Sequence, residues 1–203
     1  MMFDRGHAAQ HTMSTSLTGG IALFDTPVGA CGLGWGDDGR LRGCCLPEAD
    51  PAHTARRLRH QFPTLPWHDT LPPAMAVVAR RWLAVLTEGS RDTLADVALN
   101  FDGHAPFHVQ VWQLARQIPP GQTRSYGEMA RLLDQPPAVA RAVGQALGRN
   151  PFAPIVPCHR ILAAGGLAGG FSASGGVPLK LQLLQLEGAG LGAAASPDQP
   201  GLF

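Results

Sequence analysis

Short apolar runs separated by turn residues characterise the start of the chain. Residues 21–24, 30–35 and 41–46 are apolar or small, and the segments 26–29 and 37–39 between them carry Pro, Gly and Asp. Strands joined by such turns are typical of an antiparallel meander. We therefore expect a small antiparallel sheet.

Helical spacing follows the predicted sheet. Asp50 before Pro51 marks the N-cap and first position of a helix that should end near Gln61. A second helix is expected from about Pro72 to Gly89, with an apolar stripe of Met75, Val78, Trp82 and Val85. Residues 93–100 fit one more strand. The first half thus reads as an α/β module of about a hundred residues.

The second half has helical periodicity. Helices are predicted at 106–118, 126–133 and 137–147, and Ser125 with Glu128 forms a capping box at the second. Two short helices joined by a tight turn predict a helix-turn-helix. The helix at 137–147 has an inward face of Val139, Val143 and Leu147, and an outer face of Ala138, Arg141, Ala142 and Gln145. The spacing leaves open whether that outer face meets solvent or DNA.

Charge is distributed unevenly along the 203 residues. The net charge of +1 argues against a polyanion-coating protein but not against a local DNA-binding patch. Residues 106–163 hold six arginines and two acids, a net +4, which leaves −3 for the remainder. Arginine suits phosphates and base edges, although a GC-rich genome would produce the same preference.

Cysteine usage and hydropathy limit the classes of protein. The four cysteines, at 31, 44, 45 and 158, form no CxxC motif, so we expect no metal, no cofactor and no disulfide framework. The first 18 residues are polar, which predicts a disordered leader and no signal peptide. Apolar runs are too short to span a bilayer. A cytoplasmic protein with reduced thiols is expected.

Cys158 is the candidate for chemistry. Three prolines stiffen the segment before it, and apolar neighbours on both sides predict a recessed thiol. Most buried cysteines are inert, but the adjacent His159 suggests a thiolate nucleophile. On an extended chain these two side chains point apart, so contact needs a turn or a bridging water. Glu187, at the end of a helix predicted at 178–187, could orient the imidazole or simply be a solvated acid.

The sequence Pro-Cys-His-Arg at 157–160, preceded by Arg-Asn-Pro at 149–151 and Arg-Ala-Val-Gly at 141–144, resembles the O6-alkylguanine-DNA alkyltransferases (methylated-DNA–protein-cysteine methyltransferases). The resemblance is dense over 107–187 and looser over 23–100. It implies an α+β fold, with a small RNase H-like α/β domain before a helical DNA-binding domain. We expect a leader at 1–18, the α/β domain at 19–103, the catalytic domain at 104–190 and a flexible tail at 191–203.

The resemblance implies a DNA repair protein that flips O6-alkylguanine out of duplex DNA and keeps the alkyl group on Cys158, so that each monomer acts once. His159 would act as base through a water and Glu187 would orient it. Asn150 would shape the turn after the recognition helix, and Tyr126 would rotate the target phosphate and protonate the leaving guanine. O4-alkylthymine is a further possible substrate, and the setting would be the bacterial nucleoid.

The predicted DNA-binding and pocket residues also come from the resemblance. The second helix would enter the minor groove, with Arg141 filling the space of the flipped base. The other predicted DNA contacts are Ala138, Ala142, Gly144, Gln145, Arg124, Ser125 and Arg160. The predicted alkyl pocket consists of Pro157, Phe171, Ser172 and Ser174. The loop at 170–176 is about two residues longer than in the family, which predicts room for alkyl groups larger than methyl.

Two further interpretations concern the tail and the class of activity. Gln199, Leu202 and Phe203 resemble the Gln-x-x-Leu-Phe peptide that binds the bacterial sliding clamp. A binding-only sensor of alkylated bases is an alternative, although such relatives lack the cysteine. A cysteine hydrolase is another, although hydrolases normally bring a distant histidine to the thiol and supply an oxyanion hole.

Overall fold

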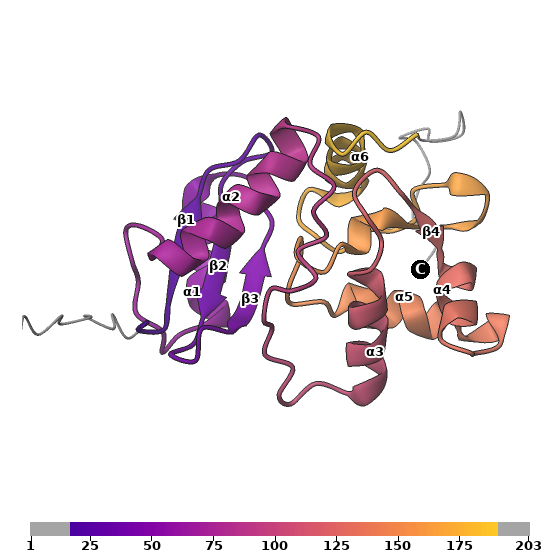
Figure 1. The fold of residues 1–203 in the computed structure, drawn as a ribbon, viewed down its shortest axis with the longest axis horizontal. Helices are drawn as coiled ribbons and strands as arrows, with labels where there is room; N and C mark the ends of the chain where they lie inside the picture. The colour runs from indigo at the N-terminus through magenta and orange to yellow at the C-terminus, as the bar shows by residue number, and fades with distance from the viewer. Residues whose placement is uncertain (1–16, 191–203) are drawn as a thin grey trace, which may run out of the picture.

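The computed structural model describes residues 17–190, which form an α/β part and a helical part, on the left and right of Figure 1. The α/β part holds an antiparallel sheet with the strand order β1 (Gly20–Phe24), β2 (Cys31–Trp35) and β3 (Leu41–Cys45). The strands lie where the apolar runs predicted them, and the predicted α+β fold is confirmed.

Helix α1 (Pro51–Gln61) packs against one face of the sheet. It begins as predicted at Asp50, whose carboxylate accepts a hydrogen bond from the His53 backbone N–H at 2.8 Å. The helix lies close to β2 because this face carries glycine. A Cβ added to Gly32 would come within 2.9 Å of the Leu58 side chain.

Helix α2 (Pro73–Thr87) packs against the alternate side chains of the same strands. Its Trp82 is 1% exposed and meets the Phe24 ring edge-on, with ring centroids 6.0 Å apart. Alternation along β3 sends the Cys44 side chain toward this core, while Cys45 packs on the α1 side. The two adjacent cysteines therefore lie on opposite faces of the strand.

The prediction of a strand at 93–100 is wrong. Within this segment the structure has turns and a single bridge to β3. The Leu41 backbone N–H donates to the Ala98 carbonyl at 2.9 Å, and the Asn100 N–H donates to the Leu41 carbonyl at 2.8 Å. Arg116 donates to two carbonyls of the segment, at 2.7 and 2.6 Å. The apolar residues here are buried between the two parts of the chain and do not mark a regular strand.

The helical part contains α3 (Pro106–Ala115), α4 (Tyr126–Leu132), the 3-10 turn η1 (Pro137–Val139), α5 (Ala140–Gly148) and α6 (Gly176–Leu186). Helix α3 ends three residues before the predicted position because Pro119 disfavours helical geometry at the residue before it. The predicted helix at 137–147 starts as a 3-10 turn, since Pro136 and Pro137 both lack a backbone donor. Helices α4 and α5 pack together as the predicted helix-turn-helix.

A short parallel pair of strands joins the helix-turn-helix to the cysteine segment. Strand β4 (Arg124–Ser125) pairs with β5 (Ile161–Leu162), with Arg124 opposite Ile161. Two-residue strands are too short to show any periodicity, so the sequence did not predict them. The pairing places the first residue of α4, Tyr126, next to the chain that follows Cys158.

The ends of the chain are only partly described. Leu17 packs against the core, and the Thr18 carbonyl accepts a hydrogen bond from the Trp35 indole at 2.9 Å, so these two residues are ordered and not part of a disordered leader. Residues 1–16 and 191–203 lie outside the described part. The second of these ranges includes the predicted clamp-binding residues Gln199, Leu202 and Phe203. Between residues 17 and 190, no helix is long and apolar enough to cross a membrane.

Candidate active site

Cys158 lies on the 3-10 turn η2 (Cys158–Arg160). Pro157 before it has φ −82° and ψ 66°, and the Cys158 N–H donates across it to the Val156 carbonyl at 2.9 Å. This inverse γ-turn fixes the start of the segment. The Cys158 residue is 9% exposed. A reaction partner must therefore be brought to the thiol.

A cavity of about 200 Å³ adjoins Cys158. Its walls come from β3 and α1 on one side, and from Asn150 and the loop at 171–173 on the other. Phe171 and Ser172 line it as predicted, whereas Pro157 is buried and lies outside the lining. Ser174 is also outside the lining, and it contributes instead to lowering the pKa of Glu48. The assignment of Ser174 to the pocket wall is therefore wrong in this structure.

A buried ionic cluster stands behind the cysteine. His159 Nε2 lies 2.9 Å from Glu187 Oε1, and Arg160 donates to the same carboxylate from Nε at 2.8 Å and from Nη2 at 2.7 Å. Burial alone would raise the pKa of Glu187, but His159 and Arg160 outweigh it and lower that pKa to about 2. Glu187 is therefore ionised, and it is not the solvated acid that its position in the sequence also allowed.

The imidazole of His159 has one committed and one uncommitted nitrogen. Burial lowers the pKa of His159 despite the opposing influence of Glu187, so the ring is neutral near pH 7. Nε2 bonds Glu187, while Nδ1 is buried and has no hydrogen-bond partner among the described residues. Nδ1 is therefore the nitrogen that can accept a proton.

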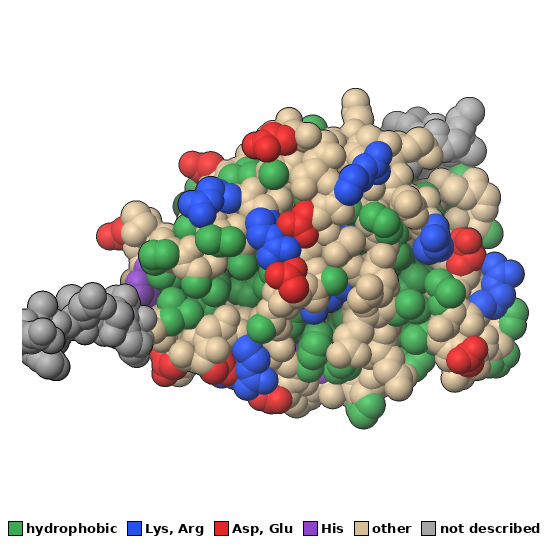
Figure 2. Space-filling view, viewed as in Figure 1, with side chains coloured by type: hydrophobic (Ala, Val, Ile, Leu, Met, Phe, Trp, Pro, Cys, Tyr) green, Lys and Arg blue, Asp and Glu red, His purple; other side chains and the backbone are tan. Residues whose placement is uncertain are grey.

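The prediction that Arg160 contacts DNA is wrong. Its side chain is held by Glu187 and by the Ile118 carbonyl, to which Nη1 donates at 2.7 Å, and the residue is 2% exposed. Arg116 is buried as well. Two of the six arginines counted in the sequence therefore add no charge to the surface. On the face drawn in Figure 2, Lys and Arg side chains lie among acidic ones.

Asn150 ties the end of α5 to the cysteine segment. Its Oδ1 accepts from the Phe152 N–H at 2.9 Å, and its Nδ2 donates to the Val156 carbonyl at 2.9 Å. Burial raises the pKa of Cys158, and a hydrogen bond with the Asn150 side chain and the charge of Lys180 only partly offset it. The resting residue is therefore a thiol, which must lose its proton in order to react.

Tyr126 lies between two glycines. A Cβ on Gly144 of α5 or on Gly169 of the loop would lie 3.6 Å from its ring. Burial raises the pKa of Tyr126, with a smaller contribution from Cys158. Both distances are ordinary van der Waals contacts, so this packing does not require a glycine at position 144, which was predicted as a DNA contact.

The remaining predicted DNA contacts lie on the helix-turn-helix. On the outer side of η1 and α5, Ala138, Arg141 and Gln145 are exposed and Ala142 is half-buried. The Ser125 hydroxyl is engaged in the capping box, where it donates to Glu128 Oε2 at 2.8 Å. Arg124 is half-buried and donates to the Thr123 carbonyl at 2.9 Å.

Lys180 is a site residue that the sequence reasoning missed. It is 0% exposed, donates from Nζ to the Ile161 carbonyl at 2.6 Å, and has Nζ 6.0 Å from the centre of the Phe171 ring. Within residues 17–190 it forms no salt bridge. Burial lowers its pKa to about 8, and Cys158 is the group that opposes this. The sequence did contain a signal that could have identified Lys180: it lies seven residues, or two helical turns, before Glu187 and so falls on the same face of α6.

The four cysteines are free thiols, and no three His, Cys, Asp or Glu side chains in the described ranges are grouped as a metal site. The candidate catalytic centre consists of Cys158, His159, Glu187, Asn150, Tyr126 and Lys180.

Known proteins share both the helical part and the whole arrangement. The family model for the DNA-binding domain of 6-O-methylguanine DNA methyltransferases matches residues 106–189. The methylated-DNA--protein-cysteine methyltransferase of Mycobacterium leprae is 53% identical over 81 residues, 40% of this chain and 47% of that protein. The Methanosarcina acetivorans protein of the same name is 46% identical over 94 residues, 46% of this chain and 58% of that protein. The match thus spans about half the length of these curated relatives.

A solved structure extends the likeness to the α/β part. Mycobacterium tuberculosis OGT in complex with DNA matches with a TM-score of 0.63 and 33% identity, over 83% of this chain and 92% of that one. The fold and the buried cysteine beside a helix-turn-helix are those of the alkyltransferase class. The chain belongs to the O6-alkylguanine-DNA alkyltransferase (methylated-DNA–protein-cysteine methyltransferase) family.

Proposed function

We propose that the protein repairs duplex DNA by transferring an alkyl group from guanine O6 to the sulfur of Cys158. One observation supports this most strongly. A recessed thiol with its own cavity and the buried His159–Glu187 pair lie together next to a helix-turn-helix. The names of the relatives point to the same reaction.

The side chains divide the chemistry among them. His159 Nδ1 takes the thiol proton through a water, and Glu187 holds the imidazole and balances its new positive charge. The sulfur then attacks the alkyl carbon in line, so that the S–C bond forms as the C–O6 bond breaks. Tyr126 gives a proton to the leaving guanine. Lys180 stabilises the transient thiolate, since it carries the nearby positive charge.

The proposal includes two further properties. The thioether product has no good leaving group, so each molecule acts once. A thiol that is buried at the end of a cavity cannot reach a base stacked inside a duplex, so the base must be flipped out. In this proposal the small outer residues of η1 and α5 allow a close approach to the groove, and the exposed Arg141 fills the space that the base leaves.

The test is a single-turnover reaction with a duplex that contains one O6-methylguanine, followed by intact-mass measurement. We expect the wild type to gain one methyl group and the Cys158→Ser variant to gain none. Tight binding without a mass change would instead indicate a sensor of alkylated bases. Repeated turnover without a covalent product would indicate a hydrolase.

A further inference from the structure

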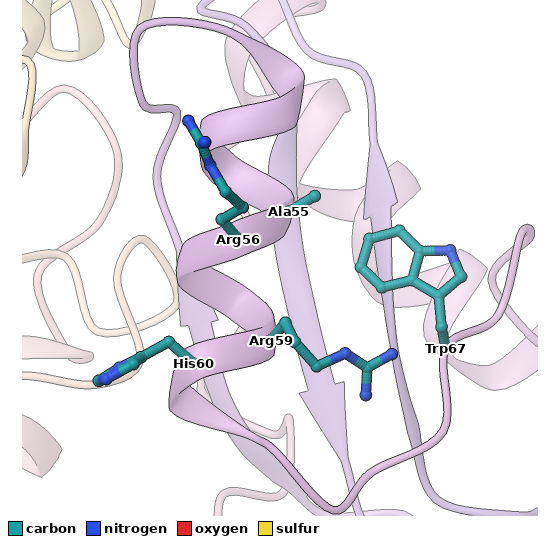
Figure 3. Close-up of a pocket in the computed structure, with 5 residues that line it drawn as sticks. All are labelled: Ala55, Arg56, Arg59, His60 and Trp67. Carbon is teal, nitrogen blue, oxygen red and sulfur yellow. The ribbon is translucent and has the colours of Figure 1, made fainter.

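One face of helix α1 packs against the sheet, and another lines the cavity beside Cys158. Leu58 is buried against the sheet. Arg57 and Gln61, one turn apart, line the cavity that contains Cys158. Arg59 reaches instead toward Trp67 in a different, open depression (Figure 3), with its guanidinium 5.9 Å from the centre of the ring. The α/β part therefore supplies the cavity with Arg57 and Gln61 from this helix.

These two residues are held in place by contacts between the two parts of the chain. The Cys44 N–H donates to the Pro151 carbonyl at 2.8 Å, which ties β3 to the segment before the cysteine. A Cβ on Gly43 would lie 2.6 Å from the Gln61 amide nitrogen and 2.9 Å from the Pro151 carbonyl oxygen. Only a glycine allows β3, the end of α1 and the active-site segment to meet here, so the α1 wall of the cavity is fixed relative to Cys158.

The size and polarity of the cavity exceed what a methyl group requires. An apolar cavity of roughly 150 Å³ holds benzene, and this one measures about 200 Å³. Arg57 and Gln61 of α1 are among the residues that line it, and Asn150 and Ser172 are further polar lining residues. Arg57 also pairs with Glu48, and its side chain is partly exposed. A hydrocarbon placed in the cavity would gain nothing from these polar groups, whereas a carboxylate or other acceptor oxygen could accept hydrogen bonds from Arg57 and Gln61.

We propose that Arg57 and Gln61 determine substrate specificity by favouring O6-alkyl groups that end in a carboxylate, of which carboxymethyl is the smallest. This inference rests on the proposed alkyl transfer to Cys158. The sulfur attacks the methylene carbon, the bond from that carbon to O6 breaks, and the guanine leaves with a proton. The product is S-carboxymethylcysteine, with its carboxylate directed toward the α1 wall.

The ion pair between Glu48 and Arg57 leads to a second prediction: a change at Glu48 should shift the substrate preference in the opposite direction to a change at Arg57. Its carboxylate accepts a hydrogen bond from Arg57 Nη1. Although partial burial opposes the shift, hydrogen bonds from Ser174 and Arg57 lower the pKa of Glu48, so it is ionised at neutral pH. Glu48 therefore competes with a substrate carboxylate for the same guanidinium. Removing its charge should strengthen the preference, while removing Arg57 should weaken it.

The experiment measures single-turnover transfer from duplexes carrying O6-carboxymethylguanine or O6-isobutylguanine, which have the same number and branching of non-hydrogen atoms. The Arg57→Ala variant should lower the carboxymethyl-to-isobutyl rate ratio roughly tenfold, as expected for loss of a hydrogen bond to a charged group. Gln61→Leu should lower it less. Glu48→Gln should raise it. Arg59→Ala is the matched control on the other face of α1 and should leave the ratio unchanged.

Several results would overturn the inference. One is a carboxymethyl-to-isobutyl rate ratio in Arg57→Ala that stays within twofold of the wild-type ratio. Another is a lower ratio in Glu48→Gln than in the wild type, and a third is a ratio that falls as much in Arg59→Ala as in Arg57→Ala. Opposite shifts in two variants of one ion pair cannot come from general damage to the fold, and Glu48→Gln still decides the matter should Arg57→Ala fail to fold. Transfer from O6-methylguanine by the wild type is measured in parallel. Its absence would refute the proposed function itself, and its presence with an unchanged ratio would refute only the role of Arg57.

Discussion

Replacing Glu187 by glutamine changes the ionic cluster behind the nucleophile with little change in shape. The wild-type carboxylate accepts three hydrogen bonds, one involving His159 and two from Arg160, and all three residues are almost fully buried. A glutamine keeps one acceptor oxygen but turns an NH2 group toward donors. It also leaves the Arg160 guanidinium buried without its carboxylate.

The structure gives the size of the expected effects. A pKa lowered from 4.5 to about 2 corresponds to about 3 kcal/mol of stabilisation at neutral pH. Breaking a buried ion pair by removing one partner costs about 3–5 kcal/mol in other proteins. A loss of about 3 kcal/mol lowers the Tm of a chain of this size by roughly 6–12 °C. Loss of the orienting group for a general base slows the reaction by roughly 10²- to 10⁴-fold.

Thermal unfolding and single-turnover methyl transfer, both at pH 7.5 and well below the Tm of the variant, measure the two effects. Glu88→Gln, which changes an exposed acid at the end of α2, is the matched control and should alter neither. A Glu187→Gln protein that melts within about 2 °C of wild type would refute the stability reasoning. One that is destabilised but transfers methyl within threefold of the wild-type rate would show that Glu187 does not support the base.

Three other predictions concern stability, pH and the tail. Lys180→Met should raise the free energy of unfolding by about 1–4 kcal/mol, because the wild type buries an ammonium group without a carboxylate, and it should slow transfer; an unchanged or lower Tm would contradict this. Stability should fall as pH drops below about 6.5 and further toward pH 2, since the pKa values of His159 and Glu187 are both lowered in the folded state and the unfolded chain binds more protons there; a Tm that is flat between pH 7 and 4 would argue against it. Deleting Leu202 and Phe203 should abolish co-elution with the bacterial sliding clamp while leaving transfer intact, and no co-elution by the full chain would end that idea.

The regular elements were predictable because their signals are local. Asp50 and Pro51 mark the start of α1, and Ser125 with Glu128 marks the start of α4, through side chains within a few residues of the backbone they cap. The strand predicted at 93–100 failed because burial between two parts of a chain also produces an apolar run. The β4–β5 pair was invisible because each strand has only two residues.

The site was predictable where it is compact in sequence. Cys158, His159 and Asn150 lie within ten residues of one another, and the family resemblance assigned Glu187 from a distance. The burial of Arg160 could not be read from the chain, since an arginine next to a catalytic pair fits a DNA contact equally well. The contribution of α1 to the cavity was also hidden, because Arg57 is about a hundred residues from Cys158 and only the tertiary fold brings them together.

The central claim is that Cys158, and no other thiol, accepts the alkyl group. Cys44 and Cys45 line the same cavity, so each is an alternative acceptor of the alkyl group. Burial raises the pKa of Cys45 to about 11 and that of Cys44 well above its usual value. The direct measurement is peptide mapping by tandem mass spectrometry after reaction with an O6-methylguanine duplex. We predict one methyl group, located on Cys158, and methylation of Cys44 or Cys45 or of no cysteine would contradict the claim.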